Sequence, residues 1–572
     1  MIGLNKIGLN QVQLNRLRLN APFPAYGKMA GGGGSGDGFP QLPGDVTRWH
    51  FGGLTNEMMA AMDDPRIEDA DHKGRFLSFK NFAWGGMSGV GGYTENYNSN
   101  RWYKVETRID ATWTYKSFNA RSIKGNIAAQ LFYQSKSSDT GFRVLSCTIK
   151  VSGLTDGQGI EYVSNGTQQF VIMRIENDGI YHLPSFDFGA KNAYYGFRFL
   201  KLQESCNITI EQLPLYPGAL VFDGVDDRGT CDNFPVLTKE KGYTVVALRQ
   251  WDQDFLNTTL TGGLLSTRNY STGEGVAFEK IESSNKGYWN LGAGGIIDFA
   301  KSPFTWQTSK QYNNVGILKG DKNHGKPLCV GCGLSGGQQC GRFAIWELVF
   351  LDHDATEEEL TKIKDYFVKT YPWLFPDQAW TVVGKTNEDE DRATIANITG
   401  NGNDLVCLNL GFIEGSGYNE EGEYAGYLVT DGVDDKITSS TFEMGNDWTV
   451  IGDWELINTG KNNNAGIVKF DSIVIYNYNP ILINIKNGRN NLIPDQNTVN
   501  AICSDGRIYS KDWKESIYNE ETESTSKNLL TIGYSGNSYT KIAFKNLAIY
   551  PTVLSKEDCI KAYNYLQTLK AK

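Results

Sequence analysis

Four side chains in the middle of this sequence have the types and spacing of a zinc site. His324, Cys329, Cys332 and Cys340 follow the pattern H-x4-C-x2-C-x7-C. Zinc sites use such close cysteine pairs, and a structural site needs all four ligands to converge. A segment that aligns with this one occurs later in the chain but has no counterpart of the four ligands. We therefore favour free thiols in a loop, with structural zinc as the alternative.

Two acidic motifs could bind calcium, which favours clustered carboxylate oxygens. The sequence DGVDD occurs twice, and its carboxylates are Asp223, Asp226 and Asp227 in one copy and Asp431, Asp434 and Asp435 in the other. The competing interpretation is a tight turn in which the Asp-Gly pair supplies the bend. The position of the glycine favours the turn.

Four tryptophans lie near glycine, asparagine and serine, in stretches that we interpret as loops: Trp251, Trp289, Trp306 and Trp513. Exposed indole rings at the loops of a β-sandwich could stack on the faces of sugars. The alternative is that each ring serves the core, as most large aromatic side chains do. These four residues are the candidate glycan-binding residues.

Catalytic patterns are missing from the sequence. Glycosidases flank the sugar bond with two carboxylates, but the nearest acidic cluster, Glu388–Asp391, has the composition of a solvated turn. The five histidines form no spaced metal motif, and neither a GxSxG elbow nor a phosphate-binding loop occurs. The sequence therefore predicts a protein that is not an enzyme and needs no cofactor.

Composition restricts the partners. The chain has 572 residues and a net charge of −10, which disfavours nucleic acid as the partner because phosphate binding needs a basic face. No run of about 18 apolar residues occurs, so we expect no membrane span. The nine cysteines are odd in number and scattered, and the N-terminus lacks the pattern of a secretion signal. Both features favour assembly in a bacterial cytoplasm.

Residues 1–28 form a basic arm with an apolar pair every five residues, and residues 29–45 are a glycine-rich linker. A five-residue step gives no continuous apolar stripe on a helix or a flat strand. A bend at each asparagine would keep the pairs on one side, but four repeats make too little core to stand alone. We therefore expect a β arm that is buried by other copies or by a docking protein through Ile2, Leu4, Ile7, Leu9, Val12, Leu14, Leu17 and Leu19.

The rest of the chain has the patterns of a mostly β protein. Residues 46–216 alternate in the manner of a β-sandwich domain. Residues 217–375 and 376–572 read as two copies of one domain, because DGVDD and two later strand motifs recur in the same order 199 to 208 positions apart. Each copy ends in an expected short helix with an N-terminal capping signal, at Thr356 and at Ser555.

Several segments resemble known proteins. The pair of segments LVFDGVDD and FAIWELVF resembles the concanavalin A-like, or laminin-G-like, jelly roll. The sequences PGALVFDGVDD (217–227), CNITIEQ (206–212) and GKTNEDEDR (384–392) are similar to repeats in virion fibre proteins of phages that infect Bacteroides, including crAss-like phages. The resemblance covers roughly residues 140–572.

The resemblance implies a homotrimeric fibre that projects from a virion. On that analogy the protein is a phage head fibre, a capsid decoration anchored to the capsid or another virion protein by its N-terminal arm. Its lectin-like domains would bind host or mucosal glycans. A tail fibre or receptor-binding protein is the alternative, followed by a bacterial surface lectin and a polysaccharide depolymerase.

Overall fold

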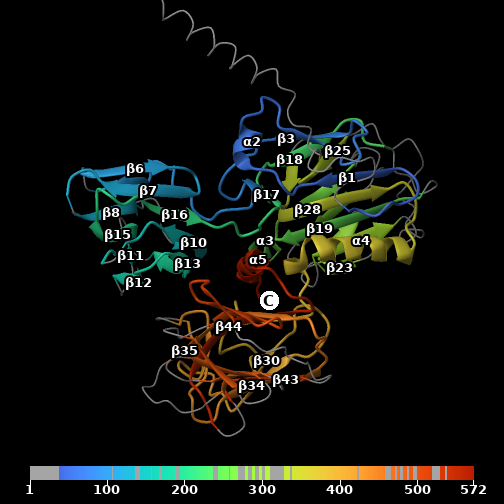
Figure 1. Ribbon diagram of the computed structural model, residues 1–572. Helices are drawn as coiled ribbons and strands as arrows, with labels where there is room; N and C mark the ends of the chain where they lie inside the picture. Colours follow the sequence, from blue (N-terminus) through green and yellow to red (C-terminus); the bar gives the residue numbers. More distant parts are fainter. Residues whose placement is uncertain are drawn as a thin grey trace, which may run out of the picture.

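The computed structural model describes most of residues 38–571 (Figure 1). The residues within this range that it does not describe are 106, 126, 135–141, 156, 166–169, 189–193, 236–241, 257, 268–276, 281–285, 290–295, 299–302, 309–326, 335–337, 421–423, 458–465, 471–472, 477–480, 486–488, 494–498, 518–527 and 535–537. The eight apolar residues of the arm and most of the linker therefore lie outside the described residues.

The described chain is mostly β, as predicted, and forms two sandwich modules with a third sandwich beside the first. In the first module a six-stranded sheet packs face to face against a ten-stranded sheet. The six strands are β4 (Gly89–Val90), β17 (Leu220–Asp223), β28 (Arg342–Leu351), β19 (Thr244–Trp251), β24 (Phe304–Thr308) and β1 (Val46–His50). The ten are β2 (Arg66–Glu68), β3 (Phe76–Lys80), β18 (Arg228–Cys231), β25 (Leu328–Val330), β20 (Gly262–Ser266), β21 (Ala277–Lys280), β22 (Lys286–Trp289), β23 (Ile296–Asp298), β26 (Cys332–Leu334) and β27 (Gln338–Cys340). Two short helices, α2 (Asn56–Ala60) and α3 (Gln253–Leu256), belong to this module.

The first module is built from two separated parts of the chain, which corrects the predicted boundary at residue 216. β1 pairs with β28 from Val46↔Leu351 onward, and β3 pairs with β18. Apolar side chains from before and after the interruption, such as Trp49 and Phe222, share one core. Residues 46–90 therefore belong to the first module and not to the domain that follows them.

The inserted sandwich spans residues 102–212 and packs two five-stranded sheets around its own core. One sheet has the order β13 (Gly179–Leu183), β10 (Cys147–Ser152), β16 (Ile208–Gln212), β7 (Ser117–Ser122) and β6 (Ile109–Trp113). The other has the order β12 (Val171–Ile175), β11 (Ile160–Ser164), β15 (Tyr194–Leu202), β8 (Ile127–Gln134) and β5 (Trp102–Lys104), and a small pair joins β14 (Phe186–Phe188) to β9 (Phe142–Val144).

The two ends of the inserted sandwich are tied to each other where they leave the first module. The amides of Leu215 and Tyr216 donate to the carbonyls of Gly92 and Gly91, at 3.0 and 2.8 Å. The side-chain oxygen of Gln212 accepts from the amide of Thr94 at 2.8 Å. The chain thus leaves and re-enters the first module at one point.

The second module repeats the architecture of the first without an insertion. One sheet contains β32 (Gly417–Tyr418), β33 (Leu428–Val429), β44 (Ile542–Tyr550), β35 (Thr449–Leu456), β40 (Val499–Cys503), β41 (Arg507–Ser510), β42 (Glu515–Ile517) and β29 (Gln378–Thr381). The other contains β30 (Thr394–Ile395), β31 (Leu405–Leu408), β34 (Lys436–Phe442), β43 (Asn528–Ile532), β36 (Gly466–Phe470), β37 (Ile473–Tyr476), β38 (Ile481–Ile485) and β39 (Arg489–Ile493).

A helix closes each module, and both predicted caps are confirmed. In α4 (Glu357–Thr370) the Thr356 hydroxyl accepts from the amide of Glu359, and the Glu359 carboxylate accepts from the amide of Thr356. In α5 (Lys556–Leu566) the Ser555 hydroxyl accepts from the amide of Asp558. These bonds satisfy amides that would otherwise be free in the first turn. No helix in the described part of the chain is long and apolar enough to cross a membrane.

Both helices and the turn η3 (Pro372–Leu374) lie in one apolar core that the two modules share. In Figure 1, α5 lies between the first module, the second module below it and the inserted sandwich to the left. The Tyr565 hydroxyl donates to Gln250 of the first module at 3.1 Å, and the Tyr563 ring lies 6.2 Å from the His182 ring of the inserted sandwich.

A charged cluster joins the inserted sandwich to the second module. The Lys545 ammonium donates to His182 Nε2 at 3.5 Å and lies 3.7 Å from the Asp453 carboxylate. Burial and the Lys545 charge lower the pKa of His182 to about 3, so the imidazole is neutral at ordinary pH. This contact holds the inserted sandwich against the second module, although the sandwich is inserted in the first.

Replacing residues 96–211 with a short turn is expected to leave both modules folded. The second module provides the pattern, because its equivalent strands are joined within residues 419–426, where the Gly426 amide donates to the Asn419 carbonyl. Circular dichroism in the near ultraviolet and thermal melting would measure the result. Deletion of residues 38–50, which removes β1, is the matched control and should unfold the first module. If the protein without residues 96–211 aggregates or melts without cooperativity, the first module does not fold from its two parts alone.

Candidate functional site

The same turn lies at one end of both modules. In the first module Asp223 Oδ1 accepts from the amide of Val225 at 2.7 Å, and in the second Asp431 Oδ1 accepts from the amide of Val433 at 2.7 Å. Gly224 and Gly432 each have φ of 78°, and a Cβ there would come within 3 Å of Arg342 in the first module and of Lys541 in the second. A glycine is needed there for both reasons. The predicted turn is therefore confirmed in both copies.

The last aspartate of each motif is buried beneath its turn. Asp227 accepts from the Asp223 amide at 3.0 Å and from the Ser88 hydroxyl at 2.9 Å. Burial and the charge of Asp223 raise the pKa of Asp227 to about 7, although the hydrogen bond from Ser88 opposes this rise. Burial raises the pKa of Asp435 as well. Each turn thus contains a carboxyl group whose environment disfavours the charged form.

A second loop is fixed against each turn by an asparagine. Asn81 Nδ2 donates to the Asp226 carbonyl at 3.2 Å, and Asn409 Nδ2 donates to the Asp434 carbonyl at 3.0 Å. These asparagines have positive φ, 70° and 67°. Asparagine tolerates this conformation better than most residues.

An aromatic residue three positions later in each loop also has a positive φ. Trp84 has φ of 49° and Phe412 has φ of 52°, and both rings are half-buried. Such a conformation costs an aromatic residue roughly 1–3 kcal/mol and persists only where the surroundings enforce it. The same strain therefore occurs at the same place in both modules.

A hairpin forms the third element of each loop end, and the two modules close it differently. In the first module Cys332 and Cys340 are paired across β26 and β27 and form a disulfide. In the second module the backbones of Tyr534 and Tyr539 form an antiparallel β-bridge at the equivalent place, and their ring centroids lie 4.8 Å apart. We call the turn, the asparagine loop and the hairpin of each module its loop end.

The disulfide contradicts two expectations about the cysteines. Two of the four proposed zinc ligands are joined to each other, so they cannot act as separate thiolates. Cys329 is a buried thiol beside them, with a pKa raised to about 11 by burial, and His324 lies outside the described residues. The expectation that the cysteines are all free thiols is wrong for this pair.

The carboxylates of each DGVDD motif lie near one another. One oxygen from each of the three aspartates falls within 4.8 Å of the others, in both modules. However, Asp223 and Asp227 already accept backbone amides of the turn, as do Asp431 and Asp435. The turn therefore accounts for these oxygens, while Asp226 and Asp434 extend to solvent.

The predicted tryptophan platform is wrong where it can be tested. Trp251 has no exposed surface and Trp513 has 2%, and each belongs to an apolar core. A buried indole cannot stack on a sugar. Trp289 lies in β22 and Trp306 in β24, and their side chains lie outside the described part of the structure.

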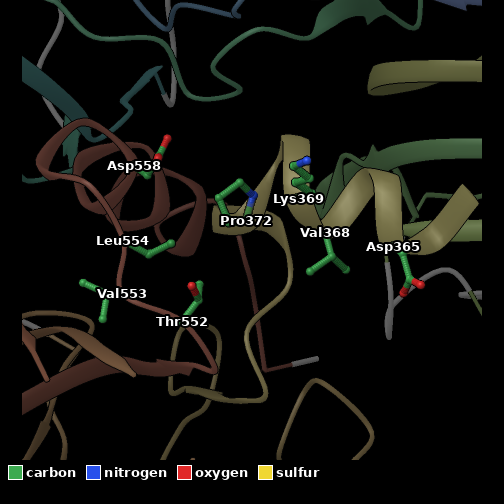
Figure 2. A pocket seen from close by; sticks show the side chains of 8 residues that line it. All are labelled: Asp365, Val368, Lys369, Pro372, Thr552, Val553, Leu554 and Asp558. Atoms are coloured by element: carbon green, nitrogen blue, oxygen red, sulfur yellow. The ribbon is translucent and has the colours of Figure 1, made fainter. Parts of the chain in front are cut away.

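A groove of about 320 Å³ lies between the two modules (Figure 2). Its walls come from the end of α4 with η3 and from the segment that leads into α5. The lining residues are Asp365, Val368, Lys369, Pro372, Thr552, Val553, Leu554 and Asp558. None of these described lining residues is aromatic, so the groove lacks the flat surface on which a sugar ring stacks.

The asparagine loop was missed by the sequence reasoning, although the sequence contains a signal for it. The segment NFAWGGMSG (81–89) returns as NLGFIEGSG (409–417), 328 positions later, whereas the DGVDD motifs are 208 positions apart. The offset shortens by 120 residues between two motifs that belong to one module. Such a step indicates an insertion in the first copy, and it would have moved the domain boundary to the correct place.

Comparisons with known proteins identify no family. No protein-family model matches the sequence, and no curated protein matches it either. Among solved structures the chain is similar to a Trypanosoma rangeli sialidase in complex with sialic acid, with a TM-score of 0.25, 9% identity, and coverage of 83% of this chain and 97% of the sialidase. It is also similar to the binding domain of botulinum neurotoxin serotype D, with a TM-score of 0.22, 9% identity, and coverage of 57% and 87%.

The presence of sialidases among these structures contradicts the prediction that the protein is not an enzyme. That prediction is withdrawn. With TM-scores below 0.5, the likeness assigns neither an activity nor a ligand to this chain.

Stability of the first module is expected to fall as the pH rises from about 4 to about 7. The folded-state pKa of Asp227 lies above its ordinary value, so folding favours the protonated carboxyl. This contribution is complete below the ordinary pKa and is lost as the pH passes the raised one. Asp227→Asn should remove the dependence and stabilise the module above pH 7, on the order of a few kcal/mol at most.

Melting temperatures measured from pH 4 to pH 8 would test this. Asp226→Asn, at the exposed neighbour, is the control and should keep the fall in stability, shifted only slightly because the charge of Asp226 contributes least to the raised pKa of Asp227. An unchanged slope in the Asp227→Asn protein would show that another group titrates.

Proposed function

We propose that the protein is a phage fibre subunit whose two sandwich modules bind glycans through their loop ends. The subunit forms a homotrimer and is attached by its N-terminal arm to the capsid as a head fibre. Attachment to a tail is the alternative within the same class. The protein is a virion component that is assembled in the cytoplasm of the host bacterium.

The duplicated loop end is the observation that carries glycan binding. Each turn places one apolar side chain in solvent, Val225 with 73% of its surface exposed and Val433 with 72%. An exposed carboxylate follows each valine, and a half-buried aromatic ring lies in the adjoining loop. Sugars offer an apolar face and hydroxyl donors, so this mixture of surfaces suits them. A strained backbone repeated in two modules supports a function at that place.

The arm and the sequence resemblance support the fibre. Four apolar pairs at a five-residue step lack a core of their own, so burial by sister copies or by a capsid protein is the natural outcome. Trimerisation would place six loop ends on one particle. Weak sites gain from that number, because several contacts can form at once.

The full-length protein should be retained on a glycan array only as a multivalent particle. We expect signal from the trimer and little from dilute monomers, because each site is weak. Mass spectrometry of the eluted sugars would show whether they leave unchanged or cleaved. A trimer that gives no signal above background on a broad array would refute glycan binding.

Deletion of residues 1–20 should leave the modules folded, with an unchanged melting transition, yet abolish incorporation into virions. The eight apolar side chains of the arm supply about 1.5 kcal/mol each when buried, most of which offsets the ordering of twenty residues. Leu9→Asp with Leu14→Asp should have the same effect. Immunolabelled virions viewed by negative stain would measure both incorporation and position. Mutant virions with a full set of fibres would rule out the arm as the anchor.

A further inference from the structure

The two loop ends differ in what their hairpins present to solvent. Cys332 and Cys340 are buried, with 0% and 5% of their surfaces exposed, so the disulfide closes the first hairpin internally. Tyr534 and Tyr539 occupy the equivalent positions and are both half-exposed. The second hairpin is therefore closed by side chains that also form part of the molecular surface.

Other apolar side chains extend this surface in the second module. Ile413 is 65% exposed and lies in the asparagine loop, where the first module has Gly85. Val433 is exposed on the turn, to which Asn409 holds that loop. The hairpin adjoins the same turn, since a Cβ on Gly533 would lie 3.6 Å from the Asp435 carbonyl oxygen. Three loops thus bring aromatic and apolar side chains to one end of the module.

We propose that this end of the second module is the principal sugar site, and that its ligand is a neutral or amine-bearing hexose. The proposal rests on the glycan-binding function above and names the ligand class. Tyr534 and Tyr539 form the stacking surface, and Val433 and Ile413 flank it. The first module has a disulfide in place of the tyrosine pair and Gly85 in place of Ile413. It therefore binds sugar more weakly.

The charges of the site determine the class of sugar. The exposed carboxylates of Glu414 and Asp434 lie on the two loops that Asn409 joins, and they can accept hydroxyl or ammonium protons from a ligand. Three half-buried cations also lie at this end. The Lys436 ammonium lies 5.2 Å from the centre of the Tyr534 ring, the Arg392 guanidinium lies 5.3 Å from the centre of the Phe412 ring, and Lys541 adjoins Gly432 of the turn. The two carboxylates are the more exposed charges, so sialic and uronic acids would meet like charge first.

The sequence of the first module suggests a variant that removes the rings and keeps the closure. Tyr534→Cys with Tyr539→Cys reproduces the disulfide of the first hairpin, and thiol titration would confirm that it forms. We expect full-length protein with this pair to keep its melting temperature and to lose at least tenfold in affinity. Val433→Asp should weaken binding severalfold, whereas Val105→Asp, at a valine of the inserted sandwich that is 51% exposed, should change it less than twofold.

Binding would be measured on an array of neutral, amino-bearing, sialylated and uronic oligosaccharides. Absence of binding by the natural protein would overturn the proposed function itself. Binding that survives both the cysteine pair and Val433→Asp would leave that function standing and overturn this site. Preference for sialylated or uronic oligosaccharides would overturn the ligand class.

Discussion

The arrangement of the whole molecule depends on one apolar core that two helices fill between two sandwiches. Leu360, Ile363 and Phe367 of α4 lie in the same core as Ala562 and Leu566 of α5. Each helix covers the sheet of its own module, and α5 also contacts the first module through Tyr565, whose ring lies 6.5 Å from that of Trp346. Removing so much apolar surface from water stabilises the arrangement far more than a flexible linker would. The modules are therefore held in one orientation, and their loop ends are displayed in fixed directions.

The insertion makes the first loop end a product of distant parts of the chain. Asn81 precedes the inserted sandwich and the DGVDD turn follows it, yet the asparagine donates to the Asp226 carbonyl. The two crossings at Gly92 and Leu215 are what bring these parts together. Contacts of this kind form late, because a long loop must close before they are made. In the second module the same contact closes a short loop, so that module can fold without waiting for another domain.

The local features of the fold could be read from the sequence, and the long-range ones could not. The caps at Thr356 and Ser555 and the turns at Gly224 and Gly432 follow from residue types a few positions apart, so pattern reasoning found them. The burial of Trp251 depends on which sheet covers it, and the residues next to it in the sequence do not indicate which sheet that is. The spacing of the cysteines likewise does not indicate that β26 pairs with β27, which places Cys332 opposite Cys340. Only the comparison of the two copies contains such long-range information.

That comparison also separates the part of the loop end that holds its shape from the part that is free to differ. The asparagine contact, the strained aromatic residue and the buried aspartate occur in both modules, so they form the shared part of the loop end. The hairpin needs closure, but a disulfide and a tyrosine pair both provide it. Since either a disulfide or a tyrosine pair can close the hairpin, the side chains at these two positions can differ without loss of the fold. A half-exposed ring forms part of the molecular surface, whereas a buried disulfide does not. The two modules thus share one scaffold and present different surfaces on it.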